Sequence, residues 1–255
     1  MAELRIDGIC KNFGGLVVAS DVTFTLSAGD RTALIGPNGA GKTTLVNLIT
    51  GALKPSSGTI SLDGKPLTRL SQPARAQAGI ARTFQVSRLF RDQTVGDNLR
   101  IAIHQQRRQS LRVVQPRADA DAVEAQVERI LTALRLQHAV GREVRHLPYG
   151  EQRLLEIALA LALEPRVLLL DEPAAGVPRG ESEAIMEVVA ALPADLAVLL
   201  IEHDMDLVFR FARKIIVLAS GAVLTVGTPE AVAADGRVKQ LYFGREHDEH
   251  RHVVH

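Results

Sequence analysis

The sequence predicts an α/β protein with a mostly parallel sheet, an antiparallel β subdomain at the N-terminal end and an inserted α-helical subdomain. Short strand-like segments separated by turns fill residues 3–31, and helical periodicity replaces them between 86 and 156. Beyond that point buried strands alternate with helices, a pattern that favours parallel strands covered on both faces. We therefore expect four regions: antiparallel β and the first part of the core (1–85), the helical subdomain (86–156), the second part of the core (157–227) and a C-terminal extension (228–255).

The first region is expected to hold short strands and two helices. Alternating apolar residues and Gly, Ser and Asp turns mark antiparallel strands before residue 31, and an apolar run follows them. A helix begins at Lys42 and stops at Gly51. The expected strands are 4–9, 17–18, 22–26, 32–35, 59–62 and 80–84, and the expected helices are 42–49 and 73–78.

The later regions alternate between longer helices and apolar strands. The stretch 119–136 is amphipathic, because Val123, Val127, Ile130, Leu131 and Leu134 fall on one helical face. The apolar run 167–170 is short and bounded by polar residues, as expected of a buried strand. The expected helices are 94–104, 119–136, 151–163, 181–192 and 204–212, and the expected strands are 167–170, 196–201, 215–218 and 223–226.

Composition is that of a compact globular protein. The chain has 255 residues, 46% hydrophobic and 23% charged, enough for one α/β domain with an inserted subdomain. A net charge of +1 lacks the basic excess typical of nucleic-acid binding, so no nucleic-acid partner is expected. Cys10 is the only cysteine, which excludes an intrachain disulfide. The sequence shows neither a secretory signal nor an apolar run long enough to span a membrane.

A glycine-rich stretch between a predicted strand and a predicted helix organises the rest of the chain. It matches G-x-x-x-x-G-K-[ST], whose glycines let backbone N–H groups surround phosphate at the positive end of a helix. Lys42 is expected to reach the β- and γ-phosphates and Thr43 to ligate Mg²⁺. The alternative is a turn that matches by chance. The expected nucleotide-binding residues of this phosphate loop are Gly36, Pro37, Asn38, Gly39, Ala40, Gly41, Lys42, Thr43 and Thr44.

An apolar strand that ends in two acids, Asp171 and Glu172, forms a second motif. Such a strand presents these side chains beside the phosphate loop, where Asp171 is expected to hold Mg²⁺ and Glu172 to polarise the attacking water. The alternative is a strand that merely ends in an acidic turn. Together the two motifs predict a nucleotide-hydrolysing core of the P-loop NTPase type.

Three further segments follow the same order and approximate spacing as in the ATP-binding-cassette ATPases, which the chain resembles over nearly its whole length. They are Arg82-Thr83-Phe84-Gln85, Leu147–Arg153 and Ile201–Asp204. The resemblance implies that Phe13 stacks on adenine. It also implies that Gln85 contacts Mg²⁺ or the attacking water and that His203 lies near the γ-phosphate.

The segment 147–152 takes the place of the family signature, usually Leu-Ser-Gly-Gly-Gln. Pro148 replaces the serine, so the contact to ATP bound by a second subunit would come from the Gly150 N–H and the helix N-terminus. Pro178 likewise stands where many members have an aspartate, and it supplies no carboxylate. The residues of the segment that the resemblance places near the partner's ATP are Leu147, Tyr149, Gly150 and Glu151.

Several segments resemble one subgroup, the ATPases of high-affinity branched-chain amino-acid importers. These segments are the Tyr-Gly signature, Arg82–Gln85 followed by Arg88-Leu89-Phe90, Glu172–Gly176 and Val238–Gly244. The C-terminal segment also resembles the ATPase of lipopolysaccharide export, and the middle of the chain favours the importer. A soluble cassette ATPase of DNA repair or translation is less compatible, because those chains insert coiled coils or join two cassettes. A P-loop kinase leaves Gln85 and His203 without a purpose.

The resemblance also implies partners. Two ATPase subunits, identical or different, are expected to face each other head to tail with ATP and Mg²⁺ between them. Permease subunits would supply the membrane spans and insert a helix behind Gln85, and an extracytoplasmic solute-binding protein would act indirectly. The chain is then expected at the cytoplasmic face of the inner membrane, as a peripheral subunit. The His-rich tail 247–255 is expected to be a solvated terminus, with metal binding as the alternative.

Overall fold

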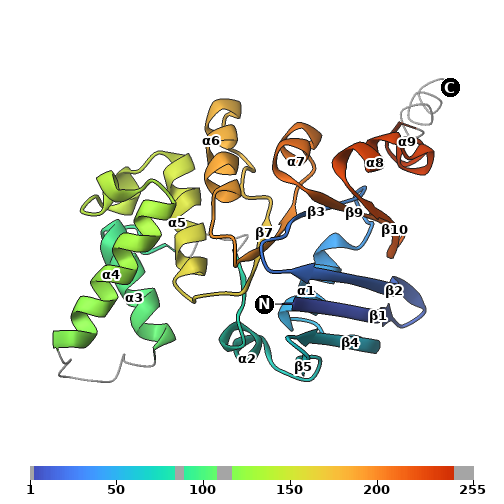
Figure 1. The fold of residues 1–255 in the computed structure, drawn as a ribbon, viewed down its shortest axis with the longest axis horizontal. Helices are drawn as coiled ribbons and strands as arrows, with labels where there is room; N and C mark the ends of the chain where they lie inside the picture. The colour runs from blue at the N-terminus through green and yellow to red at the C-terminus, as the bar shows by residue number, and fades with distance from the viewer. Residues whose placement is uncertain (1–2, 84–88, 108–116, 244–255) are drawn as a thin grey trace.

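A central sheet organises the fold, which Figure 1 shows as a ribbon. The computed structural model describes residues 3–83, 89–107 and 117–243. Within these residues one sheet has six strands in the order β10-β9-β3-β8-β7-β6, all parallel except β10, which is antiparallel to β9. The mostly parallel sheet expected from the sequence is therefore confirmed. Its strands are β3 (Arg31–Ile35), β6 (Ile80–Arg82), β7 (Val167–Asp171), β8 (Ala197–Ile201), β9 (Lys214–Ala219) and β10 (Ala222–Gly227).

A second sheet is antiparallel and comes from the N-terminal part of the chain. Among the described residues its strand order is β2-β1-β4-β5, and β1 pairs with both β2 and β4. Leu4 and Ile6 are buried while their neighbours are exposed, which is the period-two pattern of a sheet with one solvated face. The strands are β1 (Glu3–Phe13), β2 (Leu16–Ser27), β4 (Ser57–Leu62) and β5 (Lys65–Pro66).

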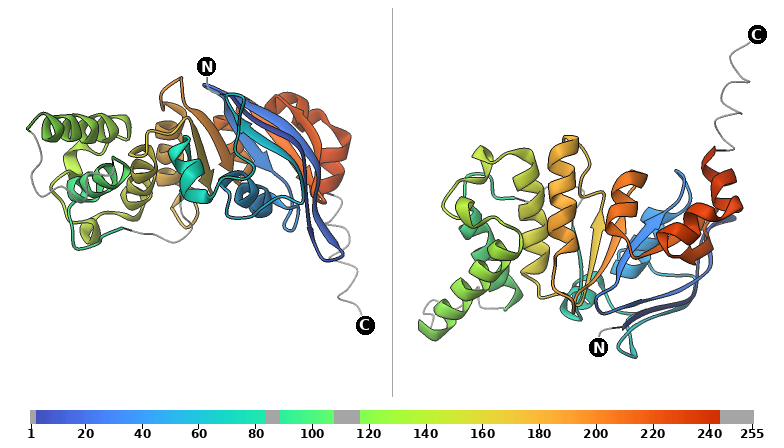
Figure 2. Two further views of the ribbon diagram at one scale, coloured as in Figure 1. Left: turned by 90° about the horizontal axis from the view of Figure 1, so that it is seen from below. Right: turned by 45° about the horizontal axis from the view of Figure 1, so that its top comes forward.

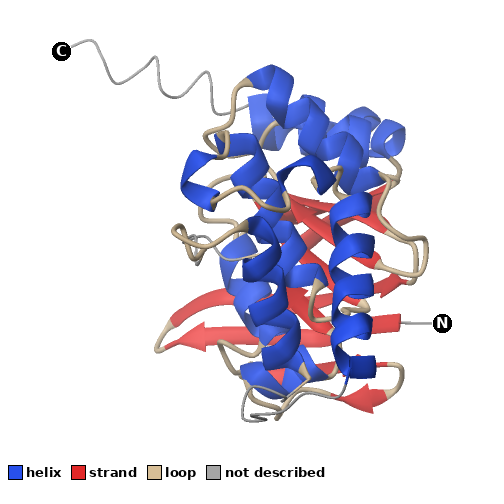
Figure 3. Cartoon of the chain, turned by 90° about the vertical axis from the view of Figure 1, so that its left-hand side faces the viewer, coloured by secondary structure: helices blue, strands red, loops and turns tan. Residues whose placement is uncertain are grey.

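Helices cover the sheets and form a separate group at one end of the molecule. Figure 2 shows α3 and α4 standing beyond the sheets, with α5 and α6 between them and the strands, and Figure 3, viewed from that end, shows helices in front of the strands. In the described part of the chain no helix is both long and apolar enough to cross a membrane. The helices are α1 (Lys42–Thr50), α2 (Gln72–Gln77), α3 (Val95–Gln106), α4 (Arg117–Ala133), α5 (Tyr149–Leu161), α6 (Arg179–Ala190), α7 (Met205–Phe211), α8 (Pro229–Ala234) and α9 (Gly236–Phe243), with 3₁₀ turns at Gln137–Ala139 and Val144–His146.

The parallel strands separate two hydrophobic cores, because their successive side chains point to opposite faces. Leu34, Leu169 and Leu199 pack with α1 and the antiparallel sheet. Their neighbours Leu168 and Leu200 pack with the helices on the other side. Helix α1, which carries the phosphate loop at its start, is thus held between the two sheets.

The C-terminal helices α8 and α9 were not expected from the sequence. Thr228 caps α8 by accepting a hydrogen bond from the Ala231 N–H, and Pro229 occupies the first turn. This Ser/Thr cap followed by proline is a recognised helix start, but both helices are short and carry little periodic signal.

A buried arginine fixes the far end of α1. Arg75 is only 1% exposed, and its guanidinium donates to the carbonyl oxygens of Leu48 (2.6 Å), Ile49 (2.8 Å) and Thr68 (2.9 Å). The last carbonyls of a helix have no partner within it and carry partial negative charge. Arg75 therefore satisfies and neutralises the C-terminal end of the helix that begins at the phosphate loop.

Replacing Arg75 with methionine is expected to lower the free energy of unfolding by about 3 kcal/mol, since several buried carbonyls lose their donor. Urea denaturation of the purified protein measures this change. The matched control is Arg69→Met, because Arg69 is exposed in the loop just before α2, the helix that carries Arg75. Equal stability of Arg75→Met and Arg69→Met would show that Arg75 does not hold α1.

Candidate nucleotide-binding site

The phosphate loop joins β3 to α1, and two of its glycines are required by close contacts. A Cβ atom at Gly36 would lie 2.2 Å from the Leu218 carbonyl oxygen, and one at Gly41 would lie 2.8 Å from the Val18 carbonyl oxygen. Gly41 also has a φ of 101°, in the left-handed region. A larger residue at either position would displace the loop, so these contacts explain why the motif needs glycine there.

Lys42 lies inside the loop. Its Nζ donates to the carbonyl oxygens of Gly36 (2.5 Å) and Pro37 (3.1 Å). Burial lowers the pKa of Lys42, while the nearby carboxylates of Glu172 and Asp171 oppose that shift. The structure therefore brings the lysine of the first predicted motif close to the two acids of the second.

The carboxyl ends of β7 and β8 place Glu172 beside His203. Asp171 pairs with Ile201 in the parallel register, and the Glu172 N–H donates to the Ile201 carbonyl oxygen (2.9 Å). His203 Nδ1 is 3.6 Å from Glu172 Oε1. Glu172 has a φ of 47°, a conformation that costs a residue other than glycine about 1 kcal/mol and is often found at functional sites.

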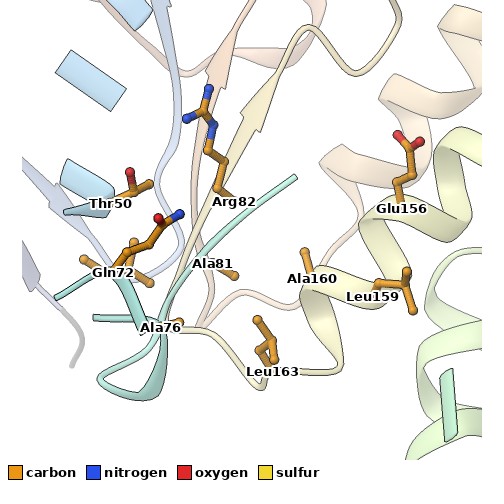
Figure 4. Close-up of a pocket in the computed structure, with 10 residues that line it drawn as sticks. Thr50, Gln72, Ala76, Ala81, Arg82, Glu156, Leu159, Ala160 and Leu163 are labelled. Carbon is orange, nitrogen blue, oxygen red and sulfur yellow. The ribbon is translucent and has the colours of Figure 1, made fainter. Parts of the chain in front are cut away.

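Arg82 is a site residue that the sequence did not reveal. Its guanidinium contacts Asp171 Oδ2 (2.5 Å) and Asn47 Oδ1 of α1 (2.7 Å), and the Asp171 side chain is 5% exposed. Figure 4 shows Arg82 on β6 beside Thr50. The pair joins β6, β7 and α1, and it orients the carboxylate that the sequence predicts as a Mg²⁺ ligand. The one available signal was an arginine directly before Thr83 at the end of a short strand.

Glu202 is a second residue whose role the sequence did not predict. It is 2% exposed, and its carboxylate accepts hydrogen bonds from the N–H groups of His203 (3.2 Å) and Ala174 (3.4 Å). Burial raises the pKa of Glu202, and these two hydrogen bonds oppose the shift. The carboxylate ties the turn after β8 to the turn after Glu172, and so fixes the position of His203.

The predicted signature segment opens α5. Leu147 is buried, whereas Tyr149 is exposed with the Arg153 guanidinium 5.0 Å from its ring centre. Glu151 faces His138, with 3.1 Å between Oε1 and Nε2. The Gly150 N–H donates to the Glu181 carboxylate of α6 (3.2 Å). In Figure 1, α5 and α1 lie on different sides of β7, so the segment is not part of the same phosphate site.

Other predicted residues lie at the margins of the site or outside the described residues. Phe13 ends β1 and is 49% exposed, with Lys11 Nζ 4.9 Å from its ring centre. An exposed aromatic face is available for stacking. Gln85 lies outside the described residues, and so does the His-rich tail 247–255.

A cavity of about 130 Å³ lies at the junction between the core and the helical group. Figure 4 shows Thr50, Gln72 and Arg82 on its core side, with Ala160 of α5 and Leu163, just beyond that helix, on the other. The α5 side is lined by apolar residues and by Glu156. The two parts of the chain thus meet next to the strand that leads into Gln85.

Known proteins of similar sequence are also nucleotide-binding proteins. The family described as ABC transporter matches residues 19–175. The chain is 40% identical over 249 residues to the "High-affinity branched-chain amino acid transport ATP-binding protein LivG" of Salmonella typhimurium, across 94% of this chain and 97% of that protein. It is 36% identical to the corresponding protein BraF of Pseudomonas aeruginosa, with the same coverage.

A solved structure leads to the same class. The ADP conformation of MJ1267, an ATP-binding cassette of an ABC transporter, superposes with a TM-score of 0.80 at 31% identity, covering 96% of this chain and 99% of that one. A P-loop core with an inserted helical group defines an ATP-hydrolysing cassette. The chain belongs to the ABC transporter family, as one of its ATPase subunits.

Proposed function

We propose that this chain powers an importer, and that the solute is a branched-chain amino acid or a related small molecule. The names of LivG and BraF, which are branched-chain amino acid transport ATP-binding proteins, support this solute class. ATP hydrolysis as the source of power is supported by the convergence of the phosphate-loop lysine Lys42 with Asp171, Glu172 and His203 at one edge of the sheet. Such convergence is what hydrolysis of a phosphate bond requires.

In the proposed reaction the ATP phosphates occupy the phosphate loop. Lys42 exchanges the carbonyl oxygens of Gly36 and Pro37 for oxygens of the β- and γ-phosphates. Glu172 orients the attacking water and accepts its proton, and His203 stabilises the charge that develops on the γ-phosphate. Their positions at adjacent strand ends support these roles.

The residues present also fit Mg²⁺. Thr43 supplies a hydroxyl oxygen and Asp171 a carboxylate oxygen, which are the donors this ion prefers. Bound there, Mg²⁺ would neutralise charge on the phosphates. The Arg82 guanidinium holds the Asp171 carboxylate in place from the side of β6. Gln85 is assigned a further contact from the resemblance alone.

We assign the second half of each ATP site to a partner subunit, the same chain or a close relative. The Gly150 N–H and the N-terminus of α5 are the donors for the partner's γ-phosphate, and the exposed Tyr149 flanks them. Buried Leu147, and Glu151 with its His138 contact, hold the segment in shape. Phe13 stacks on the adenine of its own subunit's ATP.

The permease docking site is assigned to the segment that follows Gln85 in the sequence. Phe90 of this segment is 55% exposed, and α3 adds the exposed Ile101. Exposed apolar side chains of this size would bury apolar area against a partner helix. The proposed occupant is a cytoplasmic helix of the permease, which places the chain at the cytoplasmic face of the inner membrane as a peripheral subunit. We also propose that the chain divides into its four regions after residues 85, 156 and 227.

Reconstitution with the membrane subunits tests this function. The tagged chain is purified from native membranes with its bound membrane subunits, placed in lipid nanodiscs and supplied with the solute-binding protein. We expect loaded binding protein and leucine, isoleucine or valine to raise ATP hydrolysis several-fold. Stimulation by lipopolysaccharide instead would indicate an exporter. If no membrane subunits co-purify and ATP hydrolysis does not respond to either addition, the chain would be a soluble cassette.

A further inference from the structure

The N-terminus of α5 already binds an anion from its own chain. The Gly150 N–H donates to Glu181 Oε2 (3.2 Å), and a Cβ atom at Gly150 would lie 2.6 Å from that oxygen. Pro148 occupies the cap position, and its side chain has no polar atom to accept from the helix. The Glu181 carboxylate therefore takes the place of the missing cap, at the end of the helix dipole that attracts negative charge.

The position of Glu181 depends on the loop that joins β7 to α6. Glu181 lies in the first turn of α6, only nine residues after Glu172. That loop also touches α5, since Arg153 donates to the Ala175 carbonyl oxygen (3.3 Å). Among the described residues, Glu181 forms no ion pair with a cationic side chain. Within the described part of the chain, its polar contact to another helix is with the Gly150 N–H, the donor that the proposed dimer needs for phosphate.

We propose that Glu181 is an autoinhibitory latch, a carboxylate that occupies the γ-phosphate position at Gly150 until a partner's ATP displaces it. The latch rests on the proposed function, because it matters only if the segment 147–152 binds the partner's nucleotide. A carboxylate and a γ-phosphate cannot share one N–H donor, and their like charges repel. Closure of the dimer thus requires Glu181 to turn away, which raises the ATP concentration needed for closure.

The test measures ATP-driven dimerisation in the Glu172→Gln background, where slow turnover preserves bound ATP. Light scattering after size exclusion gives the ATP concentration at half dimerisation for this parent and for versions that add Glu181→Gln or Glu181→Ala. We expect both to need about tenfold less ATP, since the competing charge is gone. Glu183→Gln is the matched control, because Glu183 lies on the same helix and pairs with Arg210 (3.0 Å).

The outcomes separate the latch from the dimer. If the Glu181 variants need as much ATP as the parent, or more, Glu181 is a structural cap and the latch is refuted. If the parent itself stays monomeric at saturating ATP, the dimer and the latch are both refuted. Thermal unfolding shows whether each variant is folded, and Glu181→Gln retains an oxygen acceptor for the Gly150 N–H.

Discussion

Replacing Glu172 with glutamine is expected to reduce ATP turnover at least about 100-fold while ATP binding stays intact. The amide can still orient water, but it accepts no proton, and a general base contributes about 10²- to 10⁴-fold to rate. His203 keeps its place in this variant, because its neighbour Glu202 is untouched. Phosphate release measures turnover, and titration with ATP measures binding.

The control for this change is Glu187→Gln, which removes an exposed carboxylate from α6. It is expected to hydrolyse ATP at the wild-type rate. Wild-type hydrolysis by Glu172→Gln would instead remove Glu172 from the reaction, and loss of ATP binding would show that its charge shapes the phosphate loop.

Replacing Lys42 with alanine is expected to weaken ATP binding about 100-fold, because the ammonium is the one cation within the loop and a charge-assisted hydrogen bond to phosphate is worth about 1.5–3 kcal/mol. Calorimetric titration with ATP measures the loss. Burial lowers the pKa of Lys42, so the charged side chain is desolvated at a cost in the free protein. Its removal is therefore not expected to unfold the chain.

Lys54→Ala is the matched control, since Lys54 is exposed just beyond the helix that Lys42 begins. Unchanged ATP affinity in Lys42→Ala would exclude Lys42 from the site. An equal loss in both variants would point to general electrostatic attraction rather than a specific contact.

Much of the fold could be predicted from local sequence. The motif around Lys42 fixes a strand, a loop and a helix in succession, and each apolar run such as 167–170 is long enough only for a buried strand. Parallel strands end at the same edge of a sheet, which brings Glu172 and His203 together without knowledge of any contact. Because both predicted motifs follow strands of this sheet, their positions at that edge could be predicted as well.

Contacts between distant side chains could not be predicted. Arg82 and Asp171 are 89 residues apart, and Gly150 and Glu181 are 31 apart. Neither pair has a spacing that a periodic pattern could reveal, because each depends on how strands and helices pack. Glu202 was visible at a strand end, but nothing in the sequence indicated that its side chain turns inward to the Ala174 N–H.

In the proposed dimer, ATP is held between the phosphate loop of one subunit and the signature segment of another. A crystal structure of Glu172→Gln with ATP and Mg²⁺ would show whether this is so. We predict two head-to-tail copies, with each γ-phosphate between Lys42 and the partner's Gly150. ATP bound away from Lys42, or an ATP-loaded chain whose Gly150 faces only solvent and its own Glu181, would contradict the claim.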